Sequence, residues 1–199
     1  MSDIRQVYLE DVTVVGIDPS TTSTGVSCPK KGWSVTLRRS KSDTAWAASL
    51  RFAKEIRILV EAMLPDIQGL NWWGRPSVIL LVLEQGAYGA RGDAHTKLAE
   101  LGALIKRELW DLPWTMDYTL SISTWRAVHG LTKAKKLDML SEAERLASCS
   151  FDSVDEAEAW LIADAVERIL SSDTSLSSAG EHRSKIHAAL LERLRVEVV

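Results

Sequence analysis

Four acidic residues, spread over most of the chain, stand where their carboxylates could meet. Asp18 and Glu84 each follow a run of apolar residues, whereas Asp155 and Glu158 lie three residues apart in a segment with helical spacing. Residues three apart on a helix project from the same face. A cluster of carboxylates without histidine or cysteine suits Mg²⁺ or Mn²⁺. Together, these four residues are candidate metal ligands and catalytic residues, although a single exposed acid would carry little weight.

The elements that must position these acids can be read from the surrounding residues. Val12–Ile17 and Ser77–Leu83 are almost continuously apolar, which predicts two buried, neighbouring central strands. Their carboxyl ends would place Asp18 and Glu84 in one crevice, where ligands bind in open α/β sheets. A helix from Val154 to Leu170 would dock by an apolar stripe and aim its two acids inward.

The remaining patterns complete an α/β fold. Three early strands, followed by alternating helices and strands, predict a mixed five-stranded sheet with helices on both faces. The other predicted strands are Gly25–Cys28, Trp33–Arg38 and Thr115–Ser121, and the other predicted helices are Asp43–Leu64, Ala94–Leu109, Lys133–Ala147 and an amphipathic segment Ser184–Arg195.

Composition sets further bounds. The chain has 199 residues, 46% hydrophobic and 26% charged, with a net charge of −3. This length predicts one domain over residues 1–170, followed by a Ser-rich linker and a C-terminal amphipathic helix over 171–199. No apolar run reaches about 20 residues, and we expect a cytoplasmic protein. Cys28 and Cys149 lack metal-site spacing, so both are expected to be buried apolar residues.

Basic and aromatic residues give weaker signals. Arg126, Lys133, Lys135 and Lys136 form the densest basic group and are candidate phosphate contacts, or else a solvated helix face. A second basic stretch, residues 30–41, stays unassigned. Helical spacing predicts that Trp46 and Trp160 are buried, and Trp125 is the one tryptophan with a candidate role near DNA.

The order of these motifs resembles the RuvC family of Holliday junction resolvases, in the RNase H-like superfamily, and particularly its phage-type members. The resemblance spans roughly residues 12–166. It rests on VVGIDPSTTSTG at 14–25, LVLEQGAYG at 81–89, TWRAVHGLTKAKKLDML at 124–140 and DEAEAWLIADA at 155–165. Residue by residue, the resemblance implies that Asp18, Glu84, Asp155 and Glu158 are the metal-binding acids. From this ligand set we expect Asp18 to bridge the two ions.

Other site residues also come from this resemblance. Lys136 matches the family's characteristic lysine near the scissile phosphate. The aromatic residue that the family inserts into the junction falls on Ala87, so Tyr88 is the candidate substitute. Two departures are Ser20, in place of a glycine, and Glu158, which is one methylene longer than the usual aspartate.

The resemblance implies a crossover junction endodeoxyribonuclease that uses two Mg²⁺ ions per active site, with Mn²⁺ as a substitute. Such an enzyme would nick two strands of like polarity in four-way junctions or in other branched DNA, and it would leave 5′-phosphate and 3′-hydroxyl ends. A phage recombination or packaging role is an expectation from resemblance alone. Paired cuts require two sites, which predicts a homodimer, and the helix with Leu98, Leu101 and Ile105 is its candidate face.

Two alternatives remain at this stage. A catalytically idle RNase H-like module could bind branched DNA or another protein, because fold does not guarantee activity. The stretch from Asp18 to Gly25 also resembles the phosphate-binding hairpin of actin-like sugar kinases. Those kinases need a second glycine-rich phosphate motif, and the rest of the chain has none.

Overall fold

The computed structural model describes residues 12–64, 78–85 and 93–197. Five strands form one mixed sheet in the order β3-β2-β1-β4-β5. The first three strands are antiparallel neighbours, and β1, β4 and β5 run parallel. The strands are β1 (Val12–Asp18), β2 (Ser23–Cys28), β3 (Trp33–Arg38), β4 (Val78–Gln85) and β5 (Thr115–Ser121).

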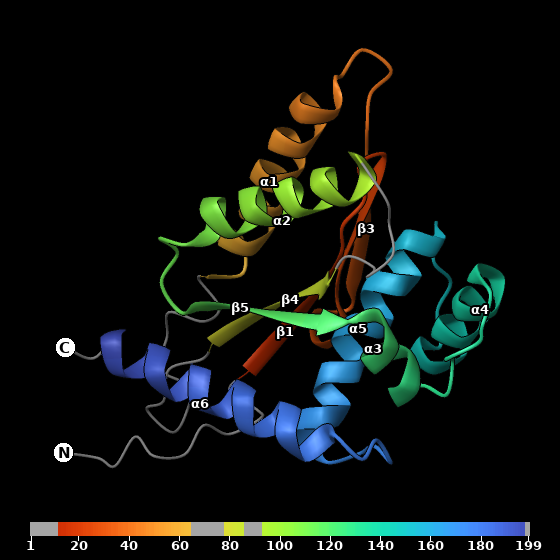
Figure 1. Ribbon diagram of the computed structural model, residues 1–199, viewed down its shortest axis with the longest axis vertical. Helices are drawn as coiled ribbons and strands as arrows, with labels where there is room; N and C mark the ends of the chain where they lie inside the picture. Colours follow the sequence, from red (N-terminus) through yellow and green to blue (C-terminus); the bar gives the residue numbers. More distant parts are fainter. Residues whose placement is uncertain (1–11, 65–77, 86–92, 198–199) are drawn as a thin grey trace.

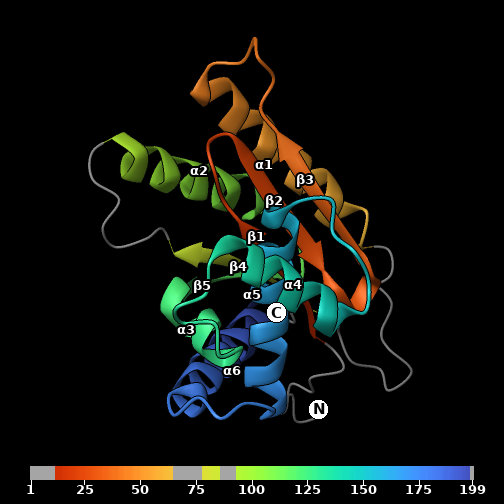
Figure 2. The same ribbon diagram turned by 90° about the vertical axis from the view of Figure 1, so that its right-hand side faces the viewer.

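Helices cover both faces of the sheet, which confirms the predicted architecture. Figure 1 shows α1 and α2 on one side, and α5, α3 and α6 on the other. Figure 2, turned by 90°, shows the same two layers with α4 beside α5. The helices are α1 (Ala45–Glu61), α2 (Asp93–Leu109), α3 (Ile122–Val128), α4 (Lys136–Ala147), α5 (Val154–Ser171) and α6 (Ala179–Glu197), and a short 3₁₀ turn, η2, spans Pro29–Lys31. No helix in the described ranges is long and apolar enough to cross a membrane.

The sheet separates two cores because side chains alternate along each strand. Val15 and Ile17 of β1 pack in the core under α1 and α2. Val12 and Val14 pack in the core with α5. Burial on both faces explains why β1 and β4 are apolar at nearly every position. It also makes the central strands a rigid base for the residues at their ends.

The C-terminal helix joins the second core. Ile186 and Leu190 of α6 are fully buried there. The Tyr118 hydroxyl lies 2.8 Å from His182 Nδ1, and Arg183 Nε donates to the Ile169 carbonyl at 2.7 Å. These contacts tie α6 to β5 and α5, and the domain boundary expected at residue 170 stays a prediction.

Several expectations about single residues were wrong. Trp46 is 53% exposed, and Cys149 is exposed, although Cys28 is buried as expected. Helical spacing fixes the direction of a side chain around the axis, but it does not say how far along the helix a covering element extends. Leu101 and Ile105 are fully buried in the core between α2, α1 and the sheet. They are therefore not available for the predicted dimer face.

The start of α4 also differs from the prediction. The helix begins at Lys136 rather than at Lys133. Gly130, which follows the end of α3, has a φ of 70°. The Lys135 backbone N–H donates to the Asp138 carboxylate at 2.8 Å. An acidic side chain at the third helical position is a common N-terminal signal. Lys133 and Lys135 therefore lie in the connection before the helix, and Lys136 stands at its first turn.

Candidate active site

The carboxyl ends of the parallel strands bring two of the predicted acids together. Register pairs Ile17 of β1 with Leu83 of β4, so the next residues, Asp18 and Glu84, are neighbours at one edge of the sheet. Both side chains are half-buried. This edge is where strand ends and loops create a crevice in open α/β sheets.

Helix α5 adds the other two acids. Asp18, Asp155 and Glu158 each offer a carboxylate oxygen, and these three oxygens lie within 4.8 Å of one another. Glu84 lies close enough for its charge to raise the pKa of Asp18. The structure thus places the four predicted residues around one point, three of them in the tightest group.

Two glycines let α5 lie directly on the sheet. A methyl group at Gly25 would come within 1.9 Å of the Asp155 carbonyl oxygen, and one at Gly16 within 2.0 Å of the Ala159 carbonyl oxygen. Both contacts are with backbone, which cannot move aside as a flexible side chain could. Glycine at these strand positions therefore sets the depth of α5, and with it the height of Asp155 and Glu158 above Asp18.

Hydroxyl groups hold the start of α5. Ser153 caps the helix by accepting from the Glu156 N–H at 3.1 Å, and Ser23 of β2 donates to Asp155 Oδ2. The buried Glu156 carboxylate accepts from Ser34 at 3.2 Å and Thr36 at 3.0 Å. Buried carboxylates need such partners. The roles of Ser23, Ser34 and Thr36 could not be predicted from the sequence, because the acids that they contact lie more than 100 residues away in the chain.

Trp125, on the helix that follows β5, contacts one of the four acids. It is fully buried on α3, directly after β5, and its indole N–H donates to Glu84 Oε2 at 2.9 Å. The expectation for Trp125 was a role near DNA. The structure instead gives it a fixed contact with a candidate ligand, because its ring is enclosed in the core.

The clustered acids perturb one another. Burial, and then the charges of three neighbouring carboxylates, raise the pKa of Asp18 well above its ordinary value. Burial raises the pKa of Glu84 to about 7, although the Trp125 hydrogen bond opposes the shift. Burial also raises the pKa of Glu158, against the charges of Lys136 and Arg126. A cluster with these shifts favours either protons or a cation close by.

The predicted basic residues take different positions. Arg126 stacks over Trp125, with Cζ 5.2 Å from the ring centroid, and its Nη2 lies 3.8 Å from Glu158 Oε1. Its Nε is buried and has no hydrogen-bond partner among the residues described. Lys136 is exposed, yet its charge lowers the pKa of Asp18. Lys133 and Lys135 are exposed before α4. Tyr88 lies outside the described residues.

This donor set fits a hard divalent cation. The ligating atoms are all carboxylate oxygens on rigid elements, the type of site that binds Mg²⁺ or Mn²⁺. Arg126 and Lys136, the two basic side chains whose charges lower the pKa of Glu158, are fewer than the four acids of the cluster. The remaining negative charge gives a cation, rather than an anion, the electrostatic advantage at this point.

Comparison with known proteins establishes the fold. No protein-family model and no curated protein sequence matches the chain. Among solved structures, T. thermophilus RuvC in complex with a Holliday junction substrate is similar with a TM-score of 0.59 and 11% identity, over 82% of this chain and 98% of that one. A second structure of Thermus thermophilus RuvC has a TM-score of 0.58 and 13% identity, over 81% and 97%. The predicted RuvC-like, RNase H-like fold is thereby confirmed.

Proposed function

We propose that this chain is a divalent-metal-dependent endonuclease that cleaves branched DNA, four-way junctions in particular. The proposal depends on one observation, the three carboxylate oxygens within 4.8 Å of one another at the carboxyl edge of an RNase H-like sheet. The likeness to a RuvC structure that holds a Holliday junction substrate supports the choice of DNA. DNA recombination or repair is the corresponding process.

The residues of the chain then divide into two tasks. Asp18, Glu84, Asp155 and Glu158 would hold the metal, two Mg²⁺ or Mn²⁺ ions in each site. Bound ions of this kind activate water and stabilise the leaving oxygen of a phosphodiester. Lys136 would contact the scissile phosphate from the first turn of α4, while Trp125 keeps Glu84 in place.

Arg126 has a separate part in this proposal. In the structure it faces Glu158 rather than open solvent. It therefore offsets part of the negative charge at the place where a phosphate must approach. Lys133 and Lys135 remain proposed contacts to phosphates beside the cut.

The decisive test incubates purified protein with a labelled four-way junction, a Y-fork and a linear duplex, in Mg²⁺, Mn²⁺, Ca²⁺ or EDTA. We expect cleavage of branched DNA in Mg²⁺ or Mn²⁺, and binding with little cleavage in Ca²⁺, because Ca²⁺ is larger and takes more ligands. Full activity in EDTA would contradict the metal assignment.

Two variants separate chemistry from binding. Asp18→Asn keeps the side-chain size and removes a ligand charge, so cleavage should fall more than about a hundredfold while junction affinity holds or improves. Lys136→Ala removes a cation, so both cleavage and affinity should fall. Wild-type cleavage by Asp18→Asn would end the nuclease assignment. Binding without any cleavage by the wild type would favour the idle module, and sugar phosphorylation from ATP would favour the kinase.

A further inference from the structure

A basic loop stands at the same sheet edge as the acidic cluster. The loop connects β3 to α1 through residues 39–44 and carries Arg39 and Lys41, and Arg38 ends β3 directly before it. Register pairs Arg38 with Ser23, and Ser23 donates to Asp155 in the cluster. The Arg39 N–H also bonds to the Thr22 carbonyl at 2.8 Å. The sequence alone left these cations unassigned, and the fold brings them beside the carboxylates.

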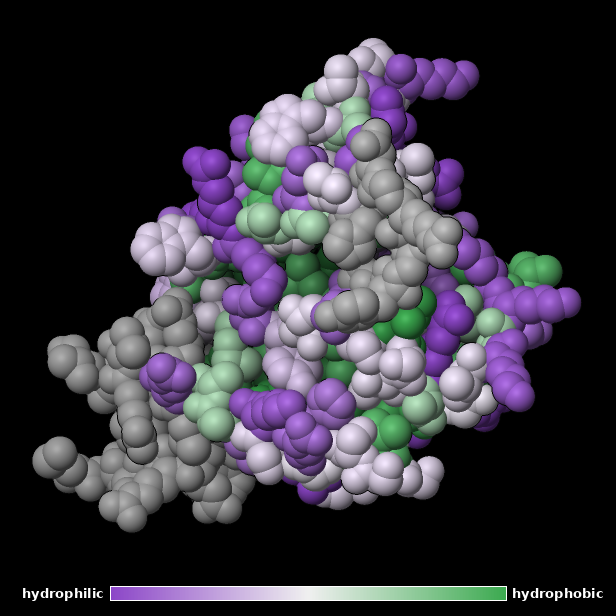
Figure 3. All heavy atoms as spheres, viewed as in Figure 1, coloured by the Kyte–Doolittle hydropathy of each residue, from purple (hydrophilic) through white to green (hydrophobic). Residues whose placement is uncertain are grey.

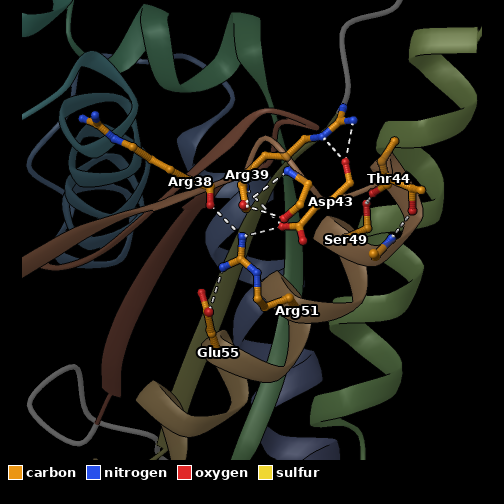
Figure 4. Close-up of polar contacts among 11 residues, drawn as sticks. Arg38, Arg39, Asp43, Thr44, Ser49, Arg51 and Glu55 are labelled. Carbon is orange, nitrogen blue, oxygen red and sulfur yellow. Dashed lines mark hydrogen bonds and ion pairs between the residues drawn. The ribbon is translucent and has the colours of Figure 1, made fainter.

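Hydrogen bonds inside the loop fix its shape, as Figure 4 shows. Asp43 Oδ2 accepts from the Ser40 N–H and from Arg51 Nη2, both at 3.1 Å. Arg39 donates twice to the Asp43 carbonyl, at 3.0 and 2.8 Å. Arg51 also donates to the Arg38 carbonyl at 2.6 Å. A loop fixed in this way loses little conformational freedom when it binds a ligand.

Two cations at this loop, Arg38 and Lys41, have no acidic partner among the residues described. Arg51 pairs with Asp43 and Glu55, and Arg57 pairs with Glu61 and Asp111. Arg38 and Lys41 are exposed, and neither makes an ion pair within the described ranges. In Figure 4 the Arg38 guanidinium extends away from the bonded groups of the loop. Arg39 donates to the neutral Asp43 carbonyl, and its charge also lowers the pKa of the nearby Asp43 carboxylate.

Protection of an open sheet edge is the simpler explanation for such charges, because β3 is an edge strand. Charges that serve this purpose lie along the strand. The β3 residues before Arg38 are Trp-Ser-Val-Thr-Leu, with no charge among them. Lys30 and Lys31 precede the start of β3, and Arg38, Arg39 and Lys41 lie at its other end, which is the end nearest to the acidic cluster.

We propose that Arg38, Lys41 and Arg39 bind the phosphate backbone of the DNA whose cleavage is proposed above. This inference rests on that function and adds a second contact surface to it. Arg38 lies two strand spacings from β1, roughly 10 Å. One strand of DNA advances about 3.4 Å per nucleotide along the helix axis. A duplex whose axis runs along this sheet edge would therefore present to the loop phosphates about three nucleotides from the cut. Lys133, Lys135 and Lys136 would hold the backbone on the other side of the acids.

The test compares Arg38→Gln/Lys41→Gln with a charge-matched control, Lys54→Gln/Arg107→Gln. The control residues are exposed on α1 and near the end of α2, away from the β3 end of the sheet edge. Junction affinity is measured by fluorescence anisotropy in Ca²⁺ over a series of salt concentrations. Each lost phosphate contact lowers the salt slope by about 0.9. We expect the salt slope of the loop variant to be smaller by about 1 to 2 and its junction affinity at 0.1 M salt to be about tenfold weaker. The control should keep the wild-type slope and affinity.

Two further measurements make the result specific. Ethylation interference on the junction should lose its signal about three nucleotides from the cut in the loop variant only. Arg38→Lys/Lys41→Arg keeps both charges and should restore affinity. If the wild type cleaves junctions while the loop variant binds them as tightly and as salt-dependently as the control, this inference is wrong and the proposed function stands. If the wild type neither binds nor cleaves branched DNA, the proposed function itself fails.

Discussion

At the scale of single residues, Trp125 connects the hydrophobic core to the acidic cluster. Its indole is enclosed in the core, and its N–H is 2.9 Å from Glu84 Oε2. The indole thereby fixes one oxygen of a candidate ligand. Groups that orient metal ligands commonly change metal affinity about 10 to 100-fold when they are removed.

Trp125→Phe should therefore weaken metal binding without unfolding the protein. Phenylalanine keeps most of the ring packing and removes the only N–H of the side chain. We expect Mn²⁺ affinity, measured by titration calorimetry without DNA, to fall about tenfold. Trp160→Phe is the matched control, because Trp160 packs against Phe151 in the second core. Equal Mn²⁺ affinity in both variants would contradict the positioning role of Trp125.

Glu167 should make the folding stability depend on pH, and it lies apart from the acidic cluster. It lines a cavity of about 550 Å³ beside Val12, Lys30 and Trp160, near the other end of α5. Its Oε1 is buried without a hydrogen-bond partner in the described part of the chain. Burial, and then the charge of Asp164, raise the pKa of Glu167 from 4.5 to about 7.

The sign of the effect follows from proton binding. Between pH 4.5 and 7 the folded state holds a proton on Glu167 that the unfolded state has released. Folding stability from this group is therefore complete below pH 4.5 and is lost as pH rises through 7. Glu167→Gln should remove this loss, which is on the order of 3 kcal/mol, in urea unfolding at pH 5 and pH 8. Glu100→Gln, at an exposed position, serves as the control, and a pH-independent difference between wild type and Glu167→Gln would contradict the assignment.

At the scale of elements, the depth of α5 depends on the two glycines beneath it. The contact at Gly25 is with the backbone of Asp155 itself. Gly25→Ala should therefore lift the first turn of α5 and separate its acids from Asp18. Overpacking typically costs 1 to 3 kcal/mol and occasionally more, so we expect a loss of about 3 kcal/mol in urea unfolding, together with weaker Mn²⁺ binding.

Gly180→Ala is the matched control for this substitution. Gly180 lies in α6, and a methyl group there would meet no atom within 4 Å. Unfolding free energies for Gly25→Ala and Gly180→Ala that agree within 1 kcal/mol would show that α5 is not seated by this contact.

The same elements indicate what the sequence could predict. The apolar runs that form β1 and β4 are buried on both faces, so their pattern was enough to predict both strands. The ends of these runs predicted the sheet edge where Asp18 and Glu84 lie. The three-residue spacing of Asp155 and Glu158 placed both on one helix face, which the structure confirms. Local patterns of this kind depend only on neighbouring residues.

Other features depend on distant partners and could not be predicted in this way. The hydrogen bond between Trp125 and Glu84 joins residues 41 positions apart, and that between Ser23 and Asp155 joins residues 132 apart. The exposure of Trp46 depends on which element covers the start of α1. The burial of Leu101 and Ile105 likewise depends on α1, against which α2 packs.

At the scale of the whole molecule, one chain supplies one acidic cluster among the residues described. Nicking two strands of a junction within one encounter requires two clusters, which a two-fold homodimer would supply. With Leu101 and Ile105 buried, a homodimer of this kind would have to use other residues at its surface. Leu98 of α2 is half-buried, Ala99 and Ala103 are exposed, and all three line a cavity of about 530 Å³ that also reaches Glu84. In Figure 3 polar and apolar residues are intermixed over the face shown.

The proposed dimer predicts a specific behaviour of mixed assemblies. Sedimentation at micromolar concentration should give a dimer mass, and a plasmid with an extruded cruciform should be converted directly to the linear form. When wild type is mixed with an excess of Asp18→Asn, most wild-type chains pair with an inactive partner, so each junction receives one nick and the product shifts to nicked circles. A monomer would respond differently, because inactive chains would only compete for junctions and slow cleavage. The ratio of linear to nicked product formed during a single binding event would then stay the same. The product ratio against the fraction of Asp18→Asn therefore distinguishes two coupled sites from two independent ones.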